Sequence, residues 1–243
     1  MLHFVLPFYN SEKVLAQNAL AIHAFLSREM AGEFELVLCD DGSRDGSAAA
    51  AKELEASHPS IRAVGYPGNR GRGYAVRFAA MTCPGEYLIF ADLDLPQTTS
   101  LGHILEMKTR LQPGRIVVGS RFLKSSETRR LWLRGAISRA HRLSVRFFFP
   151  ELDVRDPDAG FKGFDLALLK RMSAVSREDR WSWDLEILAI AKANGCPVIE
   201  IPIDWNERHE AYATSVNVLR ASWEEWTGMR RIRRNLKAGR YRL

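Results

Sequence analysis

Apolar runs alternate with segments of helical character through the first hundred residues. Four runs, LHFVLPFYN, FELVLCDD, IRAVG and YLIFA, have the length and the mostly uncharged character of strands buried on both faces of a sheet. Helical segments follow over about 11–28, up to about residue 57, and in YAVRFAAMT. Strands that alternate with helices are typical of a parallel sheet. The pattern therefore predicts the α/β fold class, with a mostly parallel central sheet and helices on both faces.

The second half of the chain continues without a linker rich in glycine, proline or serine. A helix follows residue 100, and then come the strand RIVVGSR, a basic stretch and the segment RDPDAGFKGFD. A helix that begins near Trp183 and a last strand in PVIEIPIDW complete the order. Because no strong boundary interrupts these elements, we expect one domain over 1–243.

Polar side chains follow each of the first four predicted strands. They form clusters at Pro7–Asn10, Asp40–Ser43, Asn69–Gly73 and Asp92–Gln97. The carboxyl ends of parallel strands lie at one edge of a sheet, and ligands bind beyond that edge in open α/β folds. The four clusters therefore predict a binding site at this edge.

Two carboxylates, Asp92 and Asp94, stand one residue apart where the fourth strand ends. Residues i and i+2 of a strand point to the same face, so we expect the two acids to converge. Like charges at close range repel each other unless a cation or a cationic ligand neutralises them. The alternative is a pair of acids that cap the start of a loop.

The net charge of +6 is concentrated in two segments. Residues 121–146 contain eight arginines or lysines and one acid, and residues 228–243 contain seven basic residues and no acid. The rest of the chain is therefore acidic. Such a distribution predicts an anionic partner at one surface: phosphates, lipid headgroups or nucleic acid. For residues 228–243, the alternative is a run of charges that is exposed to solvent and binds no partner.

Eight motifs occur in the order of a known family. They are LPFYN, DDGSRDGS, GNRGRG, DLD, GSR, DAGFK, WDLEIL and EIPIDW, and they span about residues 4–208. Together they resemble the family 2 glycosyltransferases of the GT-A nucleotide-sugar-binding fold, and are most similar to the dolichyl- or polyprenyl-phosphate mannose and glucose synthases. The resemblance implies a nucleotide-binding half over 1–100, an acceptor half over 101–227 and a basic tail over 228–243.

The resemblance also implies the residues of a donor site. Asp92 and Asp94, on either side of Leu93, would hold Mg²⁺ or Mn²⁺, since these cations prefer oxygen ligands and substrate phosphates. The cation would neutralise the charge on a leaving diphosphate. The other donor-binding residues would contact the base, the ribose and the diphosphate: Pro7, Tyr9, Asn10, Asp40, Asp41 and Arg72.

An amphipathic helix is expected in RRLWLRGAISRAHRLSVRFFFP. At about 100° per residue, apolar residues fill one half of the helical wheel and mainly cationic residues fill the other. The apolar half holds Leu133, Ala136, Ile137, Ala140, Leu143, Phe147 and Phe148, and the polar half holds Arg134, Ser138, Arg139, Arg142 and Arg146. Such a helix either packs on the core as a surface helix, or lies on a membrane and holds a lipid phosphate.

The residues of the acceptor side are implied by the same resemblance. Arg134 and Ser138 lie one helical turn apart, so they can grip one phosphate. If the acceptor is a phosphate, Asp184 would orient an arginine. If it is a sugar hydroxyl, Asp184 and Glu186 are the candidate general bases. The residues predicted to be catalytic are Arg121, Arg134, Ser138, Asp184 and Arg208.

These residues predict an inverting transfer of a hexose from UDP-glucose or GDP-mannose to a polyprenyl or dolichyl phosphate. Two alternatives stay open: transfer to a sugar hydroxyl in polysaccharide or glycan synthesis, and a non-catalytic basic adaptor for a membrane or a nucleic acid. The intact Asp92 and Asp94 pair argues against the adaptor, so we expect no nucleic-acid partner. The absence of an apolar run near 18 residues and the three widely spaced cysteines predict a cytoplasmic protein. The amphipathic helix and the basic tail predict peripheral contact with an anionic membrane surface.

Overall fold

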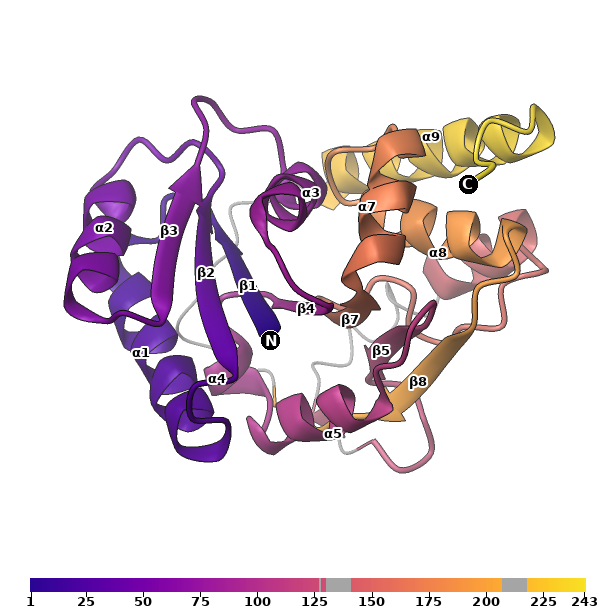
Figure 1. Cartoon of the computed structure of the whole chain (residues 1–243). Helices are drawn as coiled ribbons and strands as arrows, with labels where there is room; N and C mark the ends of the chain where they lie inside the picture. The colour runs from indigo at the N-terminus through magenta and orange to yellow at the C-terminus, as the bar shows by residue number, and fades with distance from the viewer. Residues whose placement is uncertain (127, 130–140, 207–217) are drawn as a thin grey trace.

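The computed structural model describes residues 1–126, 128–129, 141–206 and 218–243. Within them a seven-stranded sheet has the strand order β3-β2-β1-β4-β7-β5-β8 (Figure 1). Its strands are β1 (Leu2–Phe8), β2 (Phe34–Asp40), β3 (Ile61–Gly65), β4 (Tyr87–Ala91), β5 (Ile116–Ser120), β7 (Phe161–Asp165) and β8 (Val198–Pro202). A separate two-stranded sheet joins β6 (Thr128–Arg129) to β9 (Trp205–Asn206).

Helices connect most of the strands. They are α1 (Glu12–Glu29), α2 (Ser47–Ser57), α3 (Arg72–Thr82), α4 (Leu95–Thr98), α5 (Gly102–Arg110), α7 (Leu166–Val175), α8 (Trp183–Ala193) and α9 (Val218–Lys237), and residues 141–148 are also helical. The predicted helices over about 11–28, to residue 57 and from near Trp183 agree with α1, α2 and α8 to within a residue. In the described part of the chain, no helix is long and apolar enough to cross a membrane.

The strand directions confirm a mostly parallel sheet. β7 is the exception, since it runs antiparallel to both β4 and β5. The sequence pattern did not identify β7 as a strand. Its register pairs Ala91 with Phe161, so the start of β7 lies beside the end of β4. The amide of Asp92 consequently donates to the carbonyl of Gly160 over 2.8 Å, which brings the DAGFK motif to the edge where the polar clusters lie.

Each face of the sheet has its own hydrophobic core. On β1, Val5 points into a core that it shares with α3, α7, α8 and α9, whereas Phe4 and Leu6 point into a core shared with α1 and α5. All three side chains are fully buried. Alternate residues of one strand thus serve opposite faces, which is why the strands read as continuous apolar runs in the sequence.

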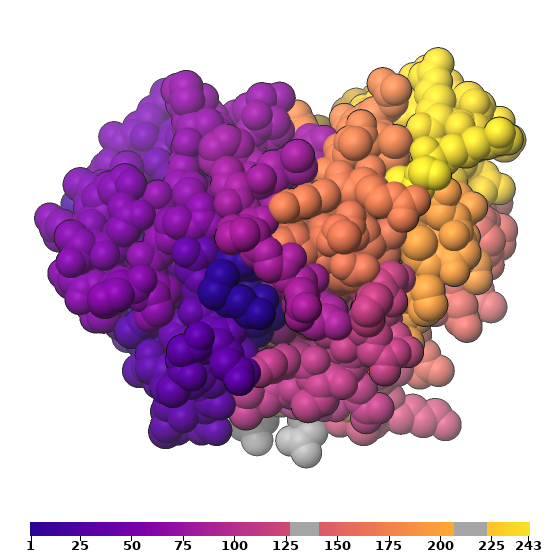
Figure 2. Space-filling view, in the orientation of Figure 1, coloured from indigo at the N-terminus to yellow at the C-terminus, as the bar shows by residue number. Residues whose placement is uncertain are grey.

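The predicted basic tail is part of a packed helix, because α9 runs across the expected boundary at residue 228. Most of its basic residues are exposed, but Met229 and Ile232 are buried in the core that includes α8. Beyond the helix, Tyr241 is buried and donates its hydroxyl to Glu186 of α8 over 2.6 Å. Figures 1 and 2 show the C-terminal residues (yellow) beside α7 and α8 (orange). The division of the remaining chain into two functional halves stays a prediction.

One histidine connects three segments that are far apart in the sequence. His141, in the helical segment 141–148, lies 2.7 Å from a carboxylate oxygen of Asp158 and 3.1 Å from one of Glu225 in α9. Burial lowers the pKa of His141, but the two carboxylates outweigh this effect and raise the pKa to about 10. A charged imidazolium therefore holds the segment against α9 and against the loop before β7.

This ion pair predicts how stability depends on pH. Because the folded-state pKa of His141 lies above the ordinary value of 6.5, its contribution is fully present below pH 6.5 and is lost as the pH rises to about 10. We expect His141→Gln to lower the free energy of unfolding by about 1.5–3 kcal/mol at pH 6. Urea unfolding of both proteins should show the difference shrinking between pH 6.5 and 10. A difference that does not change with pH would contradict a charged His141.

Candidate active site

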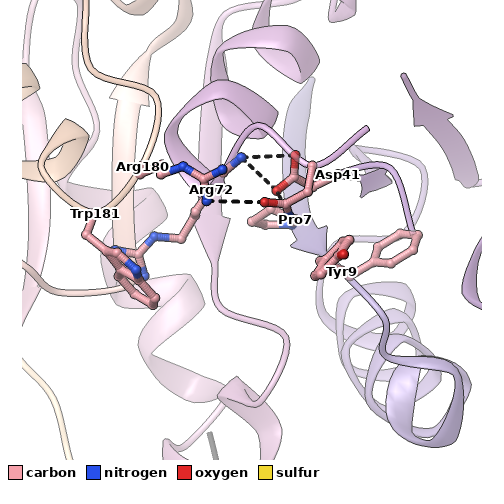
Figure 3. Close-up of a pocket in the computed structure, with 9 residues that line it drawn as sticks. Pro7, Tyr9, Asp41, Arg72, Arg180 and Trp181 are labelled. Carbon is pink, nitrogen blue, oxygen red and sulfur yellow. Dashed lines mark hydrogen bonds between the residues drawn. The ribbon is translucent and has the colours of Figure 1, made fainter. Parts of the chain in front are cut away.

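A cavity opens at the carboxyl edge of the sheet, where the sequence predicted a binding site (Figure 3). Its volume of about 230 Å³ is below the range typical of pockets that enclose a drug-sized ligand, so it can hold only part of a nucleotide sugar. Tyr9 and Trp181 stand on opposite sides of it. The lining residues are Pro7, Phe8, Tyr9, Asp41, Asn69, Gly71, Arg72, Arg180 and Trp181.

Asp41 forms part of the wall, but its carboxylate is occupied by protein donors. It accepts from the hydroxyl of Tyr66 at 2.7 Å, from the side-chain amide of Asn69 at 2.7 Å, and from the backbone amides of Arg70 and Gly71 at 2.7 and 2.8 Å. These donors fill about as many sites as a carboxylate offers. Asp41 thus holds the turn after β3 in place, and its contact with a base or ribose stays a prediction.

Gly71 allows this turn to approach the opposite wall. Its φ of +109° favours glycine, and a Cβ there would lie 2.7 Å from Cγ of Arg180 and 2.8 Å from the carbonyl oxygen of Asp179. The glycine-rich motif therefore serves two needs, a left-handed backbone and close contact with the loop before α8.

Asn10 and Asp40 are not among the residues that line this cavity. The side-chain oxygen of Asn10 accepts from the amide of Arg44 at 2.8 Å, and Asp40 accepts from the amide of Ser43 at 2.9 Å. Asn10 thus ties the end of β1 to the turn after β2, and Asp40 closes that turn from the end of β2. Of the residues predicted to surround the base, the structure brings Pro7 and Tyr9 into the cavity and leaves Asn10 and Asp40 outside it.

The two acids of the DLD motif lie just beyond the end of β4, where the sequence placed them. The strand ends at Ala91, and Asp94 occupies the N-cap position of α4. The intervening Leu93 packs against the apolar core. The acids still interact, because burial, assisted by the charge of Asp92, raises the pKa of Asp94 to about 6. Their convergence therefore comes from the turn and not from strand alternation.

Asp92 sits in a space that only glycine leaves open. A Cβ on Gly160 would lie 1.8 Å from Oδ2 of Asp92. The paired carboxylates and the raised pKa of Asp94 describe a concentration of negative charge that suits a divalent cation with oxygen ligands. On these grounds Asp92 and Asp94 fit the predicted Mg²⁺ or Mn²⁺ site.

Arg72 links Asp92 to a second, fully buried carboxylate. Its Nη1 lies 2.8 and 2.9 Å from the two oxygens of Asp92, and its Nη2 donates to Asp184. Asp184 also accepts from Nζ of Lys162 at 2.6 Å, and both of these side chains are fully buried. Burial lowers the pKa of Arg72, but the carboxylates of Asp184 and Asp92 outweigh it and raise the pKa above its usual range. Arg72 is therefore charged in the folded protein.

These contacts separate the two roles considered for the acids of WDLEIL. Asp184 contacts an arginine, as expected for a phosphate acceptor, and both its oxygens are paired with cations. Glu186 is fully buried and accepts from the hydroxyl of Tyr241 and from the amides of Arg177 and Glu178. Glu186 is thus neither a surface acid nor a base that a substrate can reach.

The predicted acceptor-side residues are only partly described. Arg121 follows β5 and donates from Nε and Nη2 to Asp156, each over 2.7 Å, so most of its fork is already engaged. Burial lowers the pKa of Arg121, but the hydrogen bond and the charge of Asp156 outweigh burial, so the pKa is raised. Arg134, Ser138 and Arg208 lie outside the described residues. Their predicted roles stay predictions.

Sequence reasoning missed Arg180, Trp181 and Lys162. The first two precede α8 and form a wall of the cavity, and Nη1 of Arg180 donates to Asn69 over 3.3 Å. The available signal was their place directly before the WDLEIL motif. It could not assign them to the cavity, because Arg180 and Asn69 are 111 residues apart in the chain. Lys162 belongs to the DAGFK motif, but only the tertiary structure shows it to be buried.

A family model matches most of the chain. Residues 4–175 match the model of glycosyl transferase family 2. The chain belongs to this family. The resemblance carried by the eight ordered motifs is thereby confirmed.

The chain is similar to curated proteins that are longer than itself. It is 30% identical to glycosyltransferase AglD of Haloferax volcanii, over 89% of this chain and 34% of that protein. It is 28% identical to a dolichyl-phosphate beta-glucosyltransferase of Trichomonas vaginalis (84% and 63% covered) and 30% identical to that of Homo sapiens (85% and 67%). The chain therefore spans between about a third and two thirds of the length of these relatives.

Solved structures confirm the GT-A fold. Glucosyl-3-phosphoglycerate synthase of Mycobacterium tuberculosis in complex with UDP superposes with a TM-score of 0.70 at 16% identity, over 96% of this chain and 80% of that one. Mannosyl-3-phosphoglycerate synthase of Rubrobacter xylanophilus superposes with a TM-score of 0.62 at 20% identity, over 99% and 75%. At these identities the likeness concerns the fold alone.

The crowding at Gly160 gives a test of the metal site. Gly160→Ala would place a methyl group 1.8 Å from Oδ2 of Asp92, so the carboxylate must move. We expect Mn²⁺ binding in the presence of UDP, measured by calorimetry, to weaken by at least about tenfold. Gly102→Ala, at the start of α5 where the nearest atom lies 3.5 Å away, is the control and should bind like the unaltered protein. Unchanged affinity in Gly160→Ala would place the cation away from Asp92.

Proposed function

We propose that this chain is an inverting glycosyltransferase that moves glucose from UDP-glucose to a polyprenyl or dolichyl phosphate. Membership of family 2 supports sugar transfer, and the relatives named dolichyl-phosphate beta-glucosyltransferase favour glucose over mannose and this acceptor class. Solved neighbours in complex with Mn²⁺ and UDP-glucose support the donor and the cation. The observation in this chain that carries the proposal is the junction of the cavity, Arg72 and the Asp92–Asp94 pair.

The cavity would enclose one part of the donor and leave the rest of it outside. Tyr9 and Trp181 offer aromatic faces to the nucleoside, and Arg72 offers charged donors to the diphosphate. Asp92 and Asp94 would hold the divalent cation, which when bound supplies charge neutralisation for the leaving diphosphate. Arg180, at the other wall, adds a second cation beside the donor.

The pairing of the buried acids favours a phosphate acceptor over a sugar hydroxyl. A phosphate oxygen is already anionic near neutral pH, so it needs no general base, whereas a hydroxyl does. The two candidate bases are engaged, Asp184 by Arg72 and Lys162, and Glu186 by Tyr241. The acceptor oxygen would attack the anomeric carbon on the face opposite the diphosphate. The new carbon–oxygen bond forms as the bond to the diphosphate breaks, which releases UDP.

The helical segment 141–148 carries the proposed membrane contact. Of its predicted apolar half, Leu143 and Phe147 lie one turn apart with 69% and 81% of their surface exposed. Two such residues on a basic helix suit the interface of an anionic bilayer. The segment also packs on the core through Val145 and Phe148, and Leu143 and Phe147 are the apolar side chains that this packing leaves exposed. Leu133 and Ile137 lie outside the described residues.

A second exposed aromatic group lies on the neighbouring helix. Trp223 and Trp226 of α9 stack with their ring centroids 5.6 Å apart, and the guanidinium of Arg230 lies 4.8 Å from the ring of Trp226. The ion pair of His141 with Glu225 joins α9 to the segment 141–148. Tryptophan beside arginine is typical of side chains at a membrane interface, so we infer peripheral contact through both helices.

The decisive experiment is a panel of donors and acceptors. UDP-glucose and GDP-mannose are each incubated with Mn²⁺ and the protein, with and without a short polyprenyl phosphate in detergent. We expect UDP-glucose to be consumed only when the lipid is present, with the glucose recovered in the organic phase. Transfer to a free sugar without lipid would favour the hydroxyl acceptor, and no consumption of any donor would favour a non-catalytic adaptor.

In the same assay Asp94→Asn tests the metal role. Removing one of two anionic ligands should weaken cation binding and lower the rate of transfer by at least about a hundredfold. Thermal unfolding should show that the fold is retained, because asparagine keeps the size and shape of the aspartate side chain. A rate close to that of the unaltered protein would exclude Asp94 as a ligand.

A double substitution tests the membrane contact. Leu143→Ser with Phe147→Ser should weaken binding to anionic vesicles by at least about tenfold, since each apolar side chain contributes about 1.5–3 kcal/mol when it leaves water. Vesicle sedimentation measures the binding. Met81→Ser, which alters a 62% exposed side chain on α3, is the control and should leave it unchanged. Lost thermal stability with unchanged vesicle binding would contradict the membrane contact.

A further inference from the structure

Arg72 is hydrogen-bonded to the carboxylate of Asp92, which is one of the two proposed ligands of the divalent cation. Its Nη1 donates to both oxygens of Asp92, at 2.8 and 2.9 Å. A guanidinium and a divalent cation that draw on the same two oxygens compete for them, because each neutralises the same charge. Binding of the cation at Asp92 must therefore weaken or break the contact with Arg72.

Arg72 is built to exchange partners at one end only. Its Nη2 donates to Asp184, which Lys162 also holds, so this end remains anchored. The other end contacts Asp92, whose side chain is 37% exposed at the site. The buried Nε of Arg72 has no hydrogen-bond partner among the described residues. Nε and Nη2 share the edge of the guanidinium that faces Asp184, so Nη1 is the donor that a ligand in the cavity can take from Asp92.

The surroundings of Arg72 indicate the kind of ligand that would bind there. The residue lines the cavity, and its guanidinium lies 5.0 Å from the ring of Trp181. A phosphate oxygen in the cavity could accept from Nη1 in place of Asp92, in a charge-assisted hydrogen bond, while Nη2 stays on Asp184. The diphosphate of the donor would bring such oxygens to this place.

We propose that Arg72 is an exchangeable counter-ion, paired with Asp92 until the donor arrives and with the donor's diphosphate afterwards. The inference rests on the proposed donor and cation. It goes beyond them because it makes their binding interdependent: the diphosphate draws Arg72 away from Asp92 and frees that carboxylate for the cation. By linkage, the cation in turn strengthens donor binding by the same factor. The divalent cation alone then binds weakly, so the site is not occupied by the cation before the donor is present.

The proposal predicts a gain of affinity on removing a side chain. We expect Arg72→Gln to bind Mn²⁺ alone about 5- to 50-fold more tightly than the unaltered protein, because the competitor for Asp92 is gone. The same variant should bind UDP more weakly in the presence of a chelator. Free Mn²⁺ is measured by electron paramagnetic resonance on the full chain, with no nucleotide present. Asp184 keeps Lys162 as a partner in this variant, and thermal unfolding checks that it folds.

Two variants make the test specific. Arg70→Gln removes the same charge two residues away, where Arg70 lies over the ring of Tyr74 and pairs with Asp179, so it should change Mn²⁺ affinity less than about threefold. Arg72→Lys keeps the charge but loses the fork, so its Mn²⁺ affinity should lie between those of the unaltered protein and Arg72→Gln. If Arg72→Gln does not fold, Arg72→Lys decides the question by the same measurement.

The outcomes separate this inference from the proposed function. Equal or weaker Mn²⁺ binding by Arg72→Gln would overturn the exchange, as would an equal gain in Arg70→Gln. So would Mn²⁺ binding that survives Asp92→Asn, because the cation would then not use this carboxylate. Neither titration requires transfer. A chain that gives the expected affinities but transfers no glucose supports the exchange and contradicts the transferase, and a chain that transfers glucose with no gain in Arg72→Gln does the reverse.

Discussion

A carboxylate sealed from water, that of Asp184, needs positive charge beside it, and the active site is arranged around this need. An unpaired buried charge is expensive, whereas a buried charge with well-placed partners is tolerated. Lys162 and Arg72 provide the partners. Because Arg72 is pinned at one end by Asp184, its other end is directed at Asp92 and at the cavity. The position of Arg72 at the cavity thus follows from the buried charge of Asp184.

The sheet topology supplies the parts of this arrangement from four separate elements. Arg72 begins α3, Asp92 follows β4, Lys162 lies on β7 and Asp184 begins α8. The antiparallel insertion of β7 matters most, because it places the start of that strand beside the end of β4. A parallel β7 would begin at the other edge of the sheet. Gly160 could then not lie against Asp92, and the DAGFK motif would be remote from the cavity.

The C-terminal part of the chain supports the cavity from behind. Glu178 and Glu186 hold the loop before α8, Glu178 through two bonds to Arg231 of α9 and Glu186 through the backbone of that loop and through Tyr241. The loop carries Arg180 and Trp181, which form one wall. A helix rich in arginine therefore has an inner side that supports the wall of the cavity and an outer side with exposed aromatic and basic residues. The proposed membrane contact and the support of the cavity would thus involve the same helix.

The sequence by itself determined the fold class, the edge of the sheet where the site lies and the family. Strand and helix periods are local properties, and eight ordered motifs are a strong signature even where each is weak. Only the tertiary structure decided which of the conspicuous residues act together. Asp40 and Asp41 are adjacent in the chain, yet Asp41 alone lines the cavity, and its oxygens are filled by a turn about thirty residues away. β7 and the buried side of α9 escaped detection, because Lys162 and Gly163 interrupt the apolar positions of the strand and the helix is hidden in a run of charges. Arg72 and Asp184 are 112 residues apart. Charge pairing depends on distance in space, and spacing along the chain does not specify that distance until the strands have taken their order.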